Sequence, residues 1–362
     1  MPLHVTADHQ TAFRKDLLDW YVATHRDLPW RQTADPYRIW LSEVMLQQTR
    51  VDQATPYYHR FTERFPSVES LAGADLDEVL LCWEGLGYYS RARKLHEAAR
   101  MVVKEFDGRI PDSEPEIRAL PGVGPYTAAA VLSIAYDKPH AVLDGNVARV
   151  LARVFAVESE IDKAPARRAL SEAAGLLLDR ERPGVFNQAV MELGATICAP
   201  TLPQCTSCPV RPVCAAYTRG EPTAYPVTTK RRAVPHYDIA VALLFDEGGR
   251  LLIQRRPEES MLGGLWEFPG GKRERGERLE ETCRRELREE LCVEISIDGL
   301  FARVSHAYSH FRITLYAYRA RIVEGTPRSS RDLPVQWVDV CDLGRFAFPR
   351  ANRRIIEHLA SK

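Results

Sequence analysis

Four cysteines near the middle of the chain are close enough in sequence for one loop to wrap a metal centre. They follow the spacing C-x6-C-x2-C-x5-C and are Cys198, Cys205, Cys208 and Cys214. Four thiolates can hold either a tetrahedral zinc ion or an iron–sulfur cluster. Structural zinc sites usually pair two short knuckles across a longer gap, whereas this run has one knuckle and two unequal arms. The spacing therefore favours a [4Fe-4S] cluster.

Disulfides are a poor alternative for these four cysteines. The first ten residues, MPLHVTADHQ, lack the charged and then apolar pattern of a secretory signal, so we expect a cytoplasmic, reducing environment. No apolar run approaches the roughly 20 residues that a membrane-spanning helix needs. The remaining cysteines are scattered, and we expect ordinary buried thiols. They are Cys82, Cys283, Cys292 and Cys341.

Two carboxylates in the first half of the chain have the surroundings of a proton donor and a fixed anion. Glu43 lies in the run WLSEVMLQQ, where apolar neighbours predict partial desolvation and a raised pKa. Helical periodicity equally allows a solvated face that Glu43 shares with Gln47 and Arg50. Asp144 directly precedes a predicted helix, so we expect an ionised N-cap there. The two alternatives for Glu43 differ in whether its carboxyl is buried.

A turn rich in glycine and proline precedes an alanine-rich predicted helix. In this turn, LPGVGPY, Gly122 and Gly124 allow backbone N–H groups to point outward at the helix N-terminus. Such a site can hold a phosphate oxygen. Taken alone, the pattern is more typical of an ordinary turn.

Three carboxylates share one face of a predicted helix in the second half of the chain. Glu286, Glu289 and Glu290 are spaced i, i+3 and i+4. Carboxylates so placed can hold Mg²⁺ against a pyrophosphate. The alternative is a solvated acidic helix face.

Two kinds of domain must position these residues. A chain of 362 residues exceeds what one hydrophobic core usually organises. Apolar residues recur at helical spacing up to about residue 220 and alternate at strand spacing after it. We predict a multidomain protein with an all-α domain over residues 1–217, a proline-containing linker over 218–235 and an α+β domain over 236–362.

The second domain is expected to open with a β-hairpin. Ile239, Val241, Leu243 and Phe245 alternate on one face, residues 246–249 form a turn, and a second strand follows. The 49 basic and 49 acidic residues balance. Nucleic-acid binding must therefore be inferred from local motifs, because a basic groove can be offset by acidic surface elsewhere.

The order of three motifs resembles that of the helix-hairpin-helix DNA glycosylases with an iron–sulfur cluster, the endonuclease III and MutY group. The motifs are LPGVGPYTA, VLDGNVARVLAR and the cysteine run at 198–214. The resemblance places the helix-hairpin-helix at about residues 118–136 and implies that the four cysteines hold a [4Fe-4S] cluster. Three N-terminal segments are similar to MutY, the adenine glycosylase that acts opposite 8-oxoguanine. They are LPWR, WLSEVMLQQT and EGLGYYSRAR.

The resemblance implies how the chemistry is divided. Glu43 would protonate N7 of the adenine, Asp144 would stabilise the positive charge on the sugar, and Asn146 and Tyr126 would support them. Relatives that cut the strand through a Schiff base carry a lysine where this chain has Tyr126, so we expect monofunctional hydrolysis. The adenine must be flipped out of the duplex to reach these groups.

Two further sets of residues follow from the same resemblance. One set would line the adenine pocket, and the other would grip the DNA backbone or wedge into the duplex beside 8-oxoguanine. Core packing remains the alternative for Trp30 and Leu46. The pocket set is Trp30, Arg31, Leu46 and Gln188, and the DNA set is Gln48, Thr49, Leu86, Tyr88, Gly122 and Gly124.

The second domain nearly completes the Nudix box, G-x5-E-x7-R-E-U-x-E-E-x-G-U. The box begins at Gly271, and Cys292 replaces its last glycine. MutY enzymes carry a C-terminal domain that resembles the nucleotide hydrolase MutT and is used for lesion recognition. We expect this role here, with Mg²⁺ bound only if the box is active.

A loop of this domain resembles the aromatic-Ser-His loop with which MutY reads 8-oxoguanine. The aromatic position, usually Phe, is Tyr308 here. Ser309 would hydrogen-bond the lesion, and His310 would support it. A plain β-turn is the alternative.

The leading hypothesis is a monomeric repair enzyme that removes adenine opposite 8-oxoguanine from double-stranded DNA. An iron–sulfur electron carrier would explain the cysteines but has no use for the hairpin, Asp144 or Glu43. A nucleotide pyrophosphatase whose helical half only binds DNA would explain the Nudix box.

Overall fold

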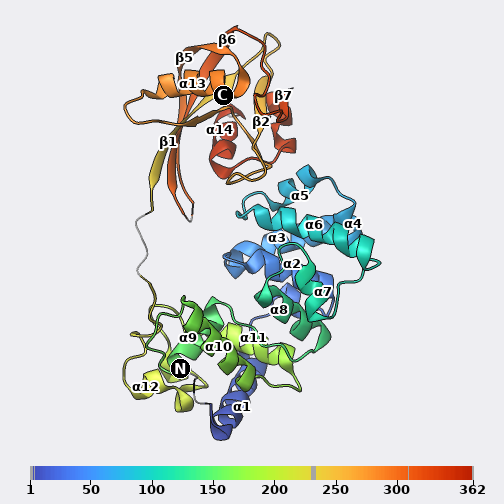
Figure 1. The fold of residues 1–362 in the computed structure, drawn as a ribbon, viewed down its shortest axis with the longest axis vertical. Helices are drawn as coiled ribbons and strands as arrows, with labels where there is room; N and C mark the ends of the chain where they lie inside the picture. Colours follow the sequence, from blue (N-terminus) through green and yellow to red (C-terminus); the bar gives the residue numbers. More distant parts are fainter. Residues whose placement is uncertain (1–2, 4, 230–233, 309, 361–362) are drawn as a thin grey trace. The chain divides into compact units, whose positions relative to one another are not determined.

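The computed structural model describes residue 3 and residues 5–229, 234–308 and 310–360 (Figure 1). Contacts divide the chain into two compact units. One comprises Met1–Ala72 and Glu97–Arg231, and the other comprises Gly73–His96 and Arg232–Lys362. The basic part of the predicted linker, Lys230 to Arg232, and the predicted lesion reader Ser309 lie outside the described residues.

The first unit is all-α, as predicted. Its core joins helices distant in sequence: Phe13 and Leu17 are buried with Leu151, Leu170 and Leu193. The helices of this unit are α1 (Ala7–Thr24), η1 (Pro29–Arg31), α2 (Pro36–Leu46), α3 (Val51–Arg64), α4 (Val68–Ala72), α7 (Glu114–Ala119), α8 (Pro125–Tyr136), α9 (Gly145–Val154), α10 (Ala164–Leu177), α11 (Pro183–Thr196), η2 (Cys205–Ser207), η3 (Arg211–Val213) and α12 (Ala215–Thr218).

Three helices of this unit begin at capping residues or prolines that favour a helix start. Helix α2 starts with Pro36 after Asp35, whose carboxylate accepts the N–H of Tyr37 at 2.9 Å. Helix α8 starts with Pro125 directly after Gly124. Asp144 caps α9, which confirms the N-cap prediction. These starts fix where the side chains of α2, α8 and α9 point.

Helix α11 packs against α8 and α9 because two of its residues are glycines. A Cβ at Gly194 would lie 2.7 Å from Cβ of Asn146, and one at Gly184 would lie 2.5 Å from the carbonyl oxygen of Ser133. Any larger side chain would push these helices apart. The close approach brings α11 to the start of α9.

The second unit contains the α+β domain and the segment with α5 (Leu76–Trp83) and the start of α6 (Ser90–Glu105). One sheet has the order β4-β1-β6-β5, with β1 and β6 parallel, and the other has the order β3-β2-β7. The elements after the linker are β1 (His236–Leu244), β2 (Leu251–Arg255), β3 (Trp266–Glu267), β4 (Gly270–Lys272), α13 (Leu279–Leu291), β5 (Glu294–Ala307), β6 (Arg312–Glu324), β7 (Val335–Val338), η4 (Val340–Arg345) and α14 (Arg350–Ala360).

The predicted hairpin is wrong in its pairing. Strands β1 and β2 form as predicted, but they belong to different sheets and share one bridge, between Phe245 and Leu251. The predicted alternation on β1 is confirmed, since Val241 and Leu243 enter one core cluster. The opposite face is buried too, because Ala240 and Ala242 pack with residues of α13.

The scattered cysteines are not uniformly buried, contrary to our expectation. Cys283 is buried in the α13 core, whereas Cys292 and Cys341 are exposed. Cys292 follows the last residue of α13 in a left-handed conformation with φ of 57°, the conformation that favours the glycine of the box. None of the helices in the described part of the chain is long and apolar enough to cross a bilayer.

Candidate active site

Glu43 is buried on α2 and bonded to Tyr126 of α8. The Tyr126 hydroxyl donates to Oε2 of Glu43 at 2.6 Å, and only 5% of Glu43 is exposed. Burial raises the pKa of Glu43 to about 7, against the lowering effect of the Tyr126 hydrogen bond, and nearby Asp144 raises it further. The solvated alternative is therefore wrong. A carboxyl with this pKa exists in both proton states near neutral pH.

Asp144 is held by the helix that it caps. Its Oδ1 accepts the N–H of Val147 at 2.7 Å, and its Oδ2 accepts Nδ2 of Asn146 at 3.0 Å. Burial raises the pKa of Asp144, while these hydrogen bonds oppose the shift. The position at the N-terminus of α9 also favours the ionised carboxylate.

A cavity of about 140 Å³ brings the predicted catalytic and pocket residues together. Trp30, buried by an edge-on contact with Tyr58 at 5.4 Å between ring centroids, forms part of its wall. Thr49, predicted to contact DNA, lines the same cavity. The lining includes Glu43, Tyr126, Asp144, Asn146, Trp30, Arg31, Leu46 and Gln188. A larger hollow of about 680 Å³, bordered by Tyr37, Glu69 and Tyr136, has a lining distinct from this predicted set.

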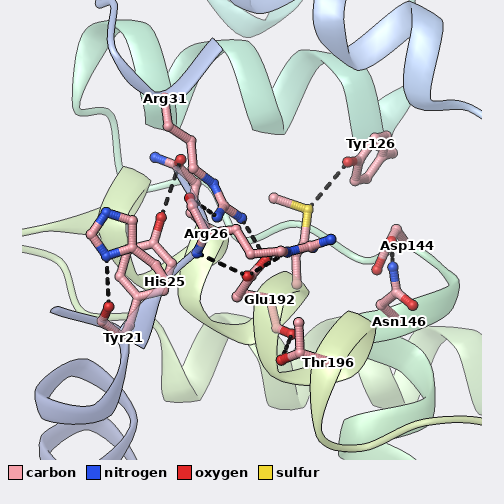
Figure 2. Close-up of polar contacts among 11 residues, drawn as sticks. Tyr21, His25, Arg26, Arg31, Tyr126, Asp144, Asn146, Glu192 and Thr196 are labelled. Carbon is pink, nitrogen blue, oxygen red and sulfur yellow. Dashed lines mark hydrogen bonds and ion pairs between the residues drawn. The ribbon is translucent and has the colours of Figure 1, made fainter. Parts of the chain in front are cut away.

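Sequence reasoning missed a buried ion-pair cluster in the same cavity wall (Figure 2). Glu192 of α11 is 2% exposed and accepts two bonds from the Arg26 guanidinium, at 2.7 and 2.8 Å. Arg31 donates to the same carboxylate at 2.8 Å. Burial alone would raise the pKa of Glu192, but hydrogen bonds from Arg26 and Arg31 outweigh it and lower the pKa to about 2.

The signal that could have found Glu192 is its spacing from Gln188. The two residues are four apart on α11, on one helical face. Both line the cavity. Tyr21 of α1 closes the cluster, because the Arg31 guanidinium lies 5.5 Å from its ring and its hydroxyl lies 3.4 Å from Oε1 of Gln188. The cavity therefore has one wall of fixed, ionised groups.

Hydrogen bonds connect the capping carboxylate to the cysteine loop. Asn146, which donates to Asp144, accepts from Nη2 of Arg149 at 2.8 Å. Nε of Arg149 donates to the carbonyl oxygen of Cys198 at 2.9 Å. Buried Arg153 donates to Sγ of Cys198 at 3.2 Å. The loop and the cavity thus share α9.

The four loop cysteines are free thiols gathered in one loop. Burial raises the pKa of Cys208 to about 12, and the neighbouring thiols of Cys198, Cys214 and Cys205 raise it further. Among the residues that the structure describes, no three Cys, His, Asp or Glu side chains are arranged to hold a metal ion. The donor set fits four-thiolate ligation, although the side chains do not adopt a ligating arrangement.

The helix-hairpin-helix turn has the conformation that its glycines allow. Gly122 is exposed with φ of 79°, and the N–H of Val123 donates to the carbonyl oxygen of Leu120 at 3.1 Å. The exposed turn leads directly into the N-terminus of α8. This arrangement leaves backbone amides where a phosphate could be bound.

The residues predicted to contact the lesion are divided between the two units. Gln48 has φ of 57° and lies with Thr49 in the first unit. Leu86 is buried in the second unit. There the Tyr88 ring contacts the His310 ring edge-on at 6.4 Å.

Tyr308 is held in place by its contacts with Phe311. Its ring stacks on Phe311 at 4.8 Å, its N–H donates to the carbonyl oxygen of Phe311 at 2.8 Å, and burial raises its pKa to about 12. His310, by contrast, is exposed.

The Nudix carboxylates occupy one face of α13, but an arginine bridges them. Arg285 donates to Glu277 at 2.8 Å, to Glu286 at 3.0 Å and to Glu289 at 3.2 Å. Glu290 accepts from Nε2 of Gln254 at 2.6 Å. Within the described residues these carboxylates do not form a metal-binding group.

Comparisons with known proteins match both halves of the chain. Residues 41–175 match the family model of HhH-GPD superfamily base excision DNA repair proteins, and residues 240–358 match that of NUDIX domains. Three proteins named adenine DNA glycosylase are similar over most of the chain. That of Mus musculus is 36% identical over 93% of this chain and 76% of its own length, that of Homo sapiens is 35% identical over 91% and 70%, and that of Buchnera aphidicola (subspecies Acyrthosiphon pisum) is 30% identical over 96% and 97%.

Solved structures resemble the helical part. A thermostable thymine-DNA glycosylase is 31% identical with a TM-score of 0.55, covering 60% of this chain and 100% of that one. An endonuclease III bound to DNA as a trapped covalent intermediate is 21% identical with a TM-score of 0.51, covering 59% and 99%. The second likeness shows the fold alone.

Proposed function

We propose, from the premise that this chain belongs to the adenine DNA glycosylase family of base excision repair, that it hydrolyses the N-glycosidic bond of adenine mispaired with 8-oxoguanine or guanine in duplex DNA. The observation that carries the proposal is the buried Glu43, bonded to Tyr126 with a pKa of about 7, in one cavity with Asp144. This is an acid and an anion on the walls of a base-sized space.

The chemistry follows from the two carboxylates. Glu43 in its acid form donates a proton to N7 of the flipped adenine, so that the base leaves as a neutral molecule. Ionised Asp144 stabilises the positive charge on the sugar. Tyr126 offers a hydroxyl where an amine would be needed for a Schiff base, so the product is an abasic site in an uncut strand.

The ion-pair wall supports selection of adenine. Arg26 and Arg31 keep Glu192 ionised, and together with the backbone N–H of Arg26 they occupy both of its carboxylate oxygens, so that this wall fixes the shape of the pocket. Trp30 and Leu46 supply apolar surface for the base in the same cavity.

The four cysteines are proposed to hold a [4Fe-4S] cluster that shapes the loop rather than acting on the glycosidic bond. The hydrogen bonds from Arg149 to Cys198 and Asn146 support a connection between this loop and Asp144. The second domain is proposed to recognise 8-oxoguanine through Tyr308, Ser309 and His310. Arg285, itself a residue of the box, pairs with Glu286 and Glu289, and the departure of Cys292 from the last glycine of the box favours lesion recognition over pyrophosphate hydrolysis.

The test is a duplex with adenine opposite 8-oxoguanine, treated with protein and then with alkali to cut abasic sites. We expect wild type to give strand breaks and Glu43→Gln to lower the single-turnover rate by roughly 10²- to 10⁴-fold, the range of one general acid. Glu63→Gln, an exposed glutamate on α3, is the matched control and should keep the wild-type rate. An uncut duplex with wild type, or full cutting by Glu43→Gln, would refute the proposal.

A further inference from the structure

Three arginines tie the segment Gly73–His96 to the α+β domain within the second unit. Arg353 of α14 pairs with Glu84, Arg255 of β2 pairs with Asp77 at 2.9 Å, and Arg93 donates to the carbonyl oxygens of Glu258, at 3.0 Å, and Gly263. The partners are far apart in sequence, so these contacts build one surface from two parts of the chain.

The pair of Arg353 and Glu84 has the best geometry of these contacts. Nε and Nη2 of Arg353 donate to the two carboxylate oxygens of Glu84 at 2.5 and 2.6 Å. The side chains are only 21% and 15% exposed. Two parallel charge-assisted bonds fix direction as well as distance.

Arg353 is itself held rigidly before it reaches Glu84. Its Nη2 also donates to the carbonyl oxygen of Phe346 at 2.7 Å, and its Nη1 donates to that of Leu343 at 3.3 Å. Its guanidinium lies 5.3 Å from the Phe348 ring. The α+β domain therefore presents the guanidinium in one orientation, so that the position of Glu84 is determined by this domain.

Glu84 begins a loop whose backbone is unusual. Gly85, Gly87 and Tyr88 have φ of 97°, 79° and 50°, and left-handed backbone at a non-glycine residue such as Tyr88 is disfavoured unless contacts support it. The Tyr88 ring at the end of this loop contacts His310. The loop from Glu84 to Tyr88 thus lies against His310.

We propose that Arg353 is a positioning residue for lesion selectivity. Through Glu84 it fixes the loop 84–88 on the domain that carries Tyr308 and His310, so that Tyr88 and His310 meet 8-oxoguanine as one preassembled surface. The inference rests on the proposed function, because it concerns how that activity discriminates its opposite base. Preassembly removes the ordering cost that binding would otherwise include.

The experiment compares single-turnover excision and duplex affinity for adenine opposite 8-oxoguanine and opposite guanine. We expect Arg353→Ala and Glu84→Ala each to reduce the preference for the 8-oxoguanine duplex by about tenfold, as for loss of one partly buried charged pair. The rate at saturating protein opposite guanine should stay unchanged. The double variant should lose no more preference than Arg353→Ala alone, since that substitution already removes the bonds to Glu84.

Matched variants separate positioning from folding. Arg345→Ala removes an exposed pair with Asp342 in the same domain and should keep the wild-type preference. Arg353→Lys keeps the charge but loses the two-bond geometry, so a partial loss of preference is expected. Glu84→Ala leaves the bonds from Arg353 to Leu343 and Phe346 in place, which makes it the decisive variant if Arg353→Ala unfolds the domain.

The outcomes are distinct. If wild type excises adenine, the proposed function is upheld. An unchanged preference for the 8-oxoguanine duplex in Glu84→Ala, or additive losses of this preference in the double variant, would then overturn the inference about Arg353. If wild type excises adenine from neither duplex, the proposed function itself is refuted. Slower hydrogen exchange at residues 85–88 in wild type than in Glu84→Ala, measured without DNA, is expected if the loop is preassembled.

Discussion

Glu43 and Glu192 line one cavity, and their surroundings shift their pKa values in opposite directions. Burial raises the pKa of Glu43 to about 7, whereas two arginines lower that of Glu192 to about 2. One carboxyl can therefore carry a proton at neutral pH while the other stays ionised. Such separation lets Glu43 act as the proton donor while Glu192 holds the arginines of the wall and Asp144 supplies the catalytic anion.

The pH dependence of excision should follow this division. We expect kcat/KM to fall as pH rises above about 7, because the acid form of Glu43 is lost. On the acid side it should fall where Asp144 becomes protonated, at a pH above the usual range of an aspartate, since its pKa is raised. A rate that still rises from pH 7 to pH 9 would contradict the role of Glu43 as proton donor.

The same shifts predict opposite effects of two isosteric substitutions on stability. The pKa of Glu43 is raised from 4.5 to about 7 in the folded protein. The folded protein therefore becomes less stable as pH rises through this window, by about 3 kcal/mol at pH 8. Glu43→Gln should therefore raise Tm at pH 8 and leave it nearly unchanged below pH 4.5.

Glu192→Gln should lower Tm at pH 8, the opposite of the effect expected for Glu43→Gln. Because folding lowers the pKa of Glu192 to about 2, its carboxylate stabilises the folded protein above pH 4.5. This contribution to the free energy of unfolding is lost as pH falls toward 2. Removing the charge takes the carboxylate partner from Arg31, 11% exposed, and from Arg26, 39% exposed, and should cost about 3 kcal/mol. Thermal unfolding of both variants at pH 8 is the measurement, and shifts of the same sign would contradict it.

At the scale of elements, the approach of α11 to α9 decides where Asp144 and Asn146 lie. A methyl group at Gly194 would meet Cβ of Asn146 at 2.7 Å and its backbone at 3.1 Å. We expect Gly194→Ala to destabilise the protein by about 1–3 kcal/mol and to slow excision, because one of the helices must move.

Helix α10 offers the matched control for this substitution. Among the described residues, a Cβ at Gly175 would have nothing within 4 Å. Gly175→Ala should therefore raise stability by about 0.5–1 kcal/mol through helix propensity and leave excision unchanged. Denaturant unfolding and single-turnover assays of both variants check the pair, and a wild-type rate for Gly194→Ala would refute the role given to the contact.

Element types followed well from the sequence, but pairing did not. The helical half, both strands β1 and β2 and the cap at Asp144 were predictable from periodicity and local chemistry. The partners of β1 were not, because its parallel pairing with β6 joins residues such as Val241 and Ala317, which local patterns cannot connect. The hydrogen-bond partner of Glu43 was likewise out of reach of local patterns, because Tyr126 lies 83 positions away.

At the scale of the whole molecule, the predicted boundaries at 217 and 236 remain a prediction. Local composition could not indicate that Gly73–His96 belongs to the same compact unit as the C-terminal domain. The bond between Arg353 and Glu84 spans 269 positions, and each residue looks like an ordinary surface charge in its own segment. Sequence motifs identified the individual loops, but their placement in one compact unit depends on contacts between residues distant in sequence.

The cluster of Glu192, Arg26 and Arg31 also constrains how a different base preference could evolve. Glu192 is 2% exposed and pairs with two arginines, of which Arg31 is 11% and Arg26 39% exposed. Replacement of Glu192 alone leaves the Arg31 guanidinium, 11% exposed, without its carboxylate partner, so an ancestor that changed this residue would lose stability before gaining a new substrate. Routes to a new specificity must therefore begin from a background with stability to spare, or replace the three residues in concert.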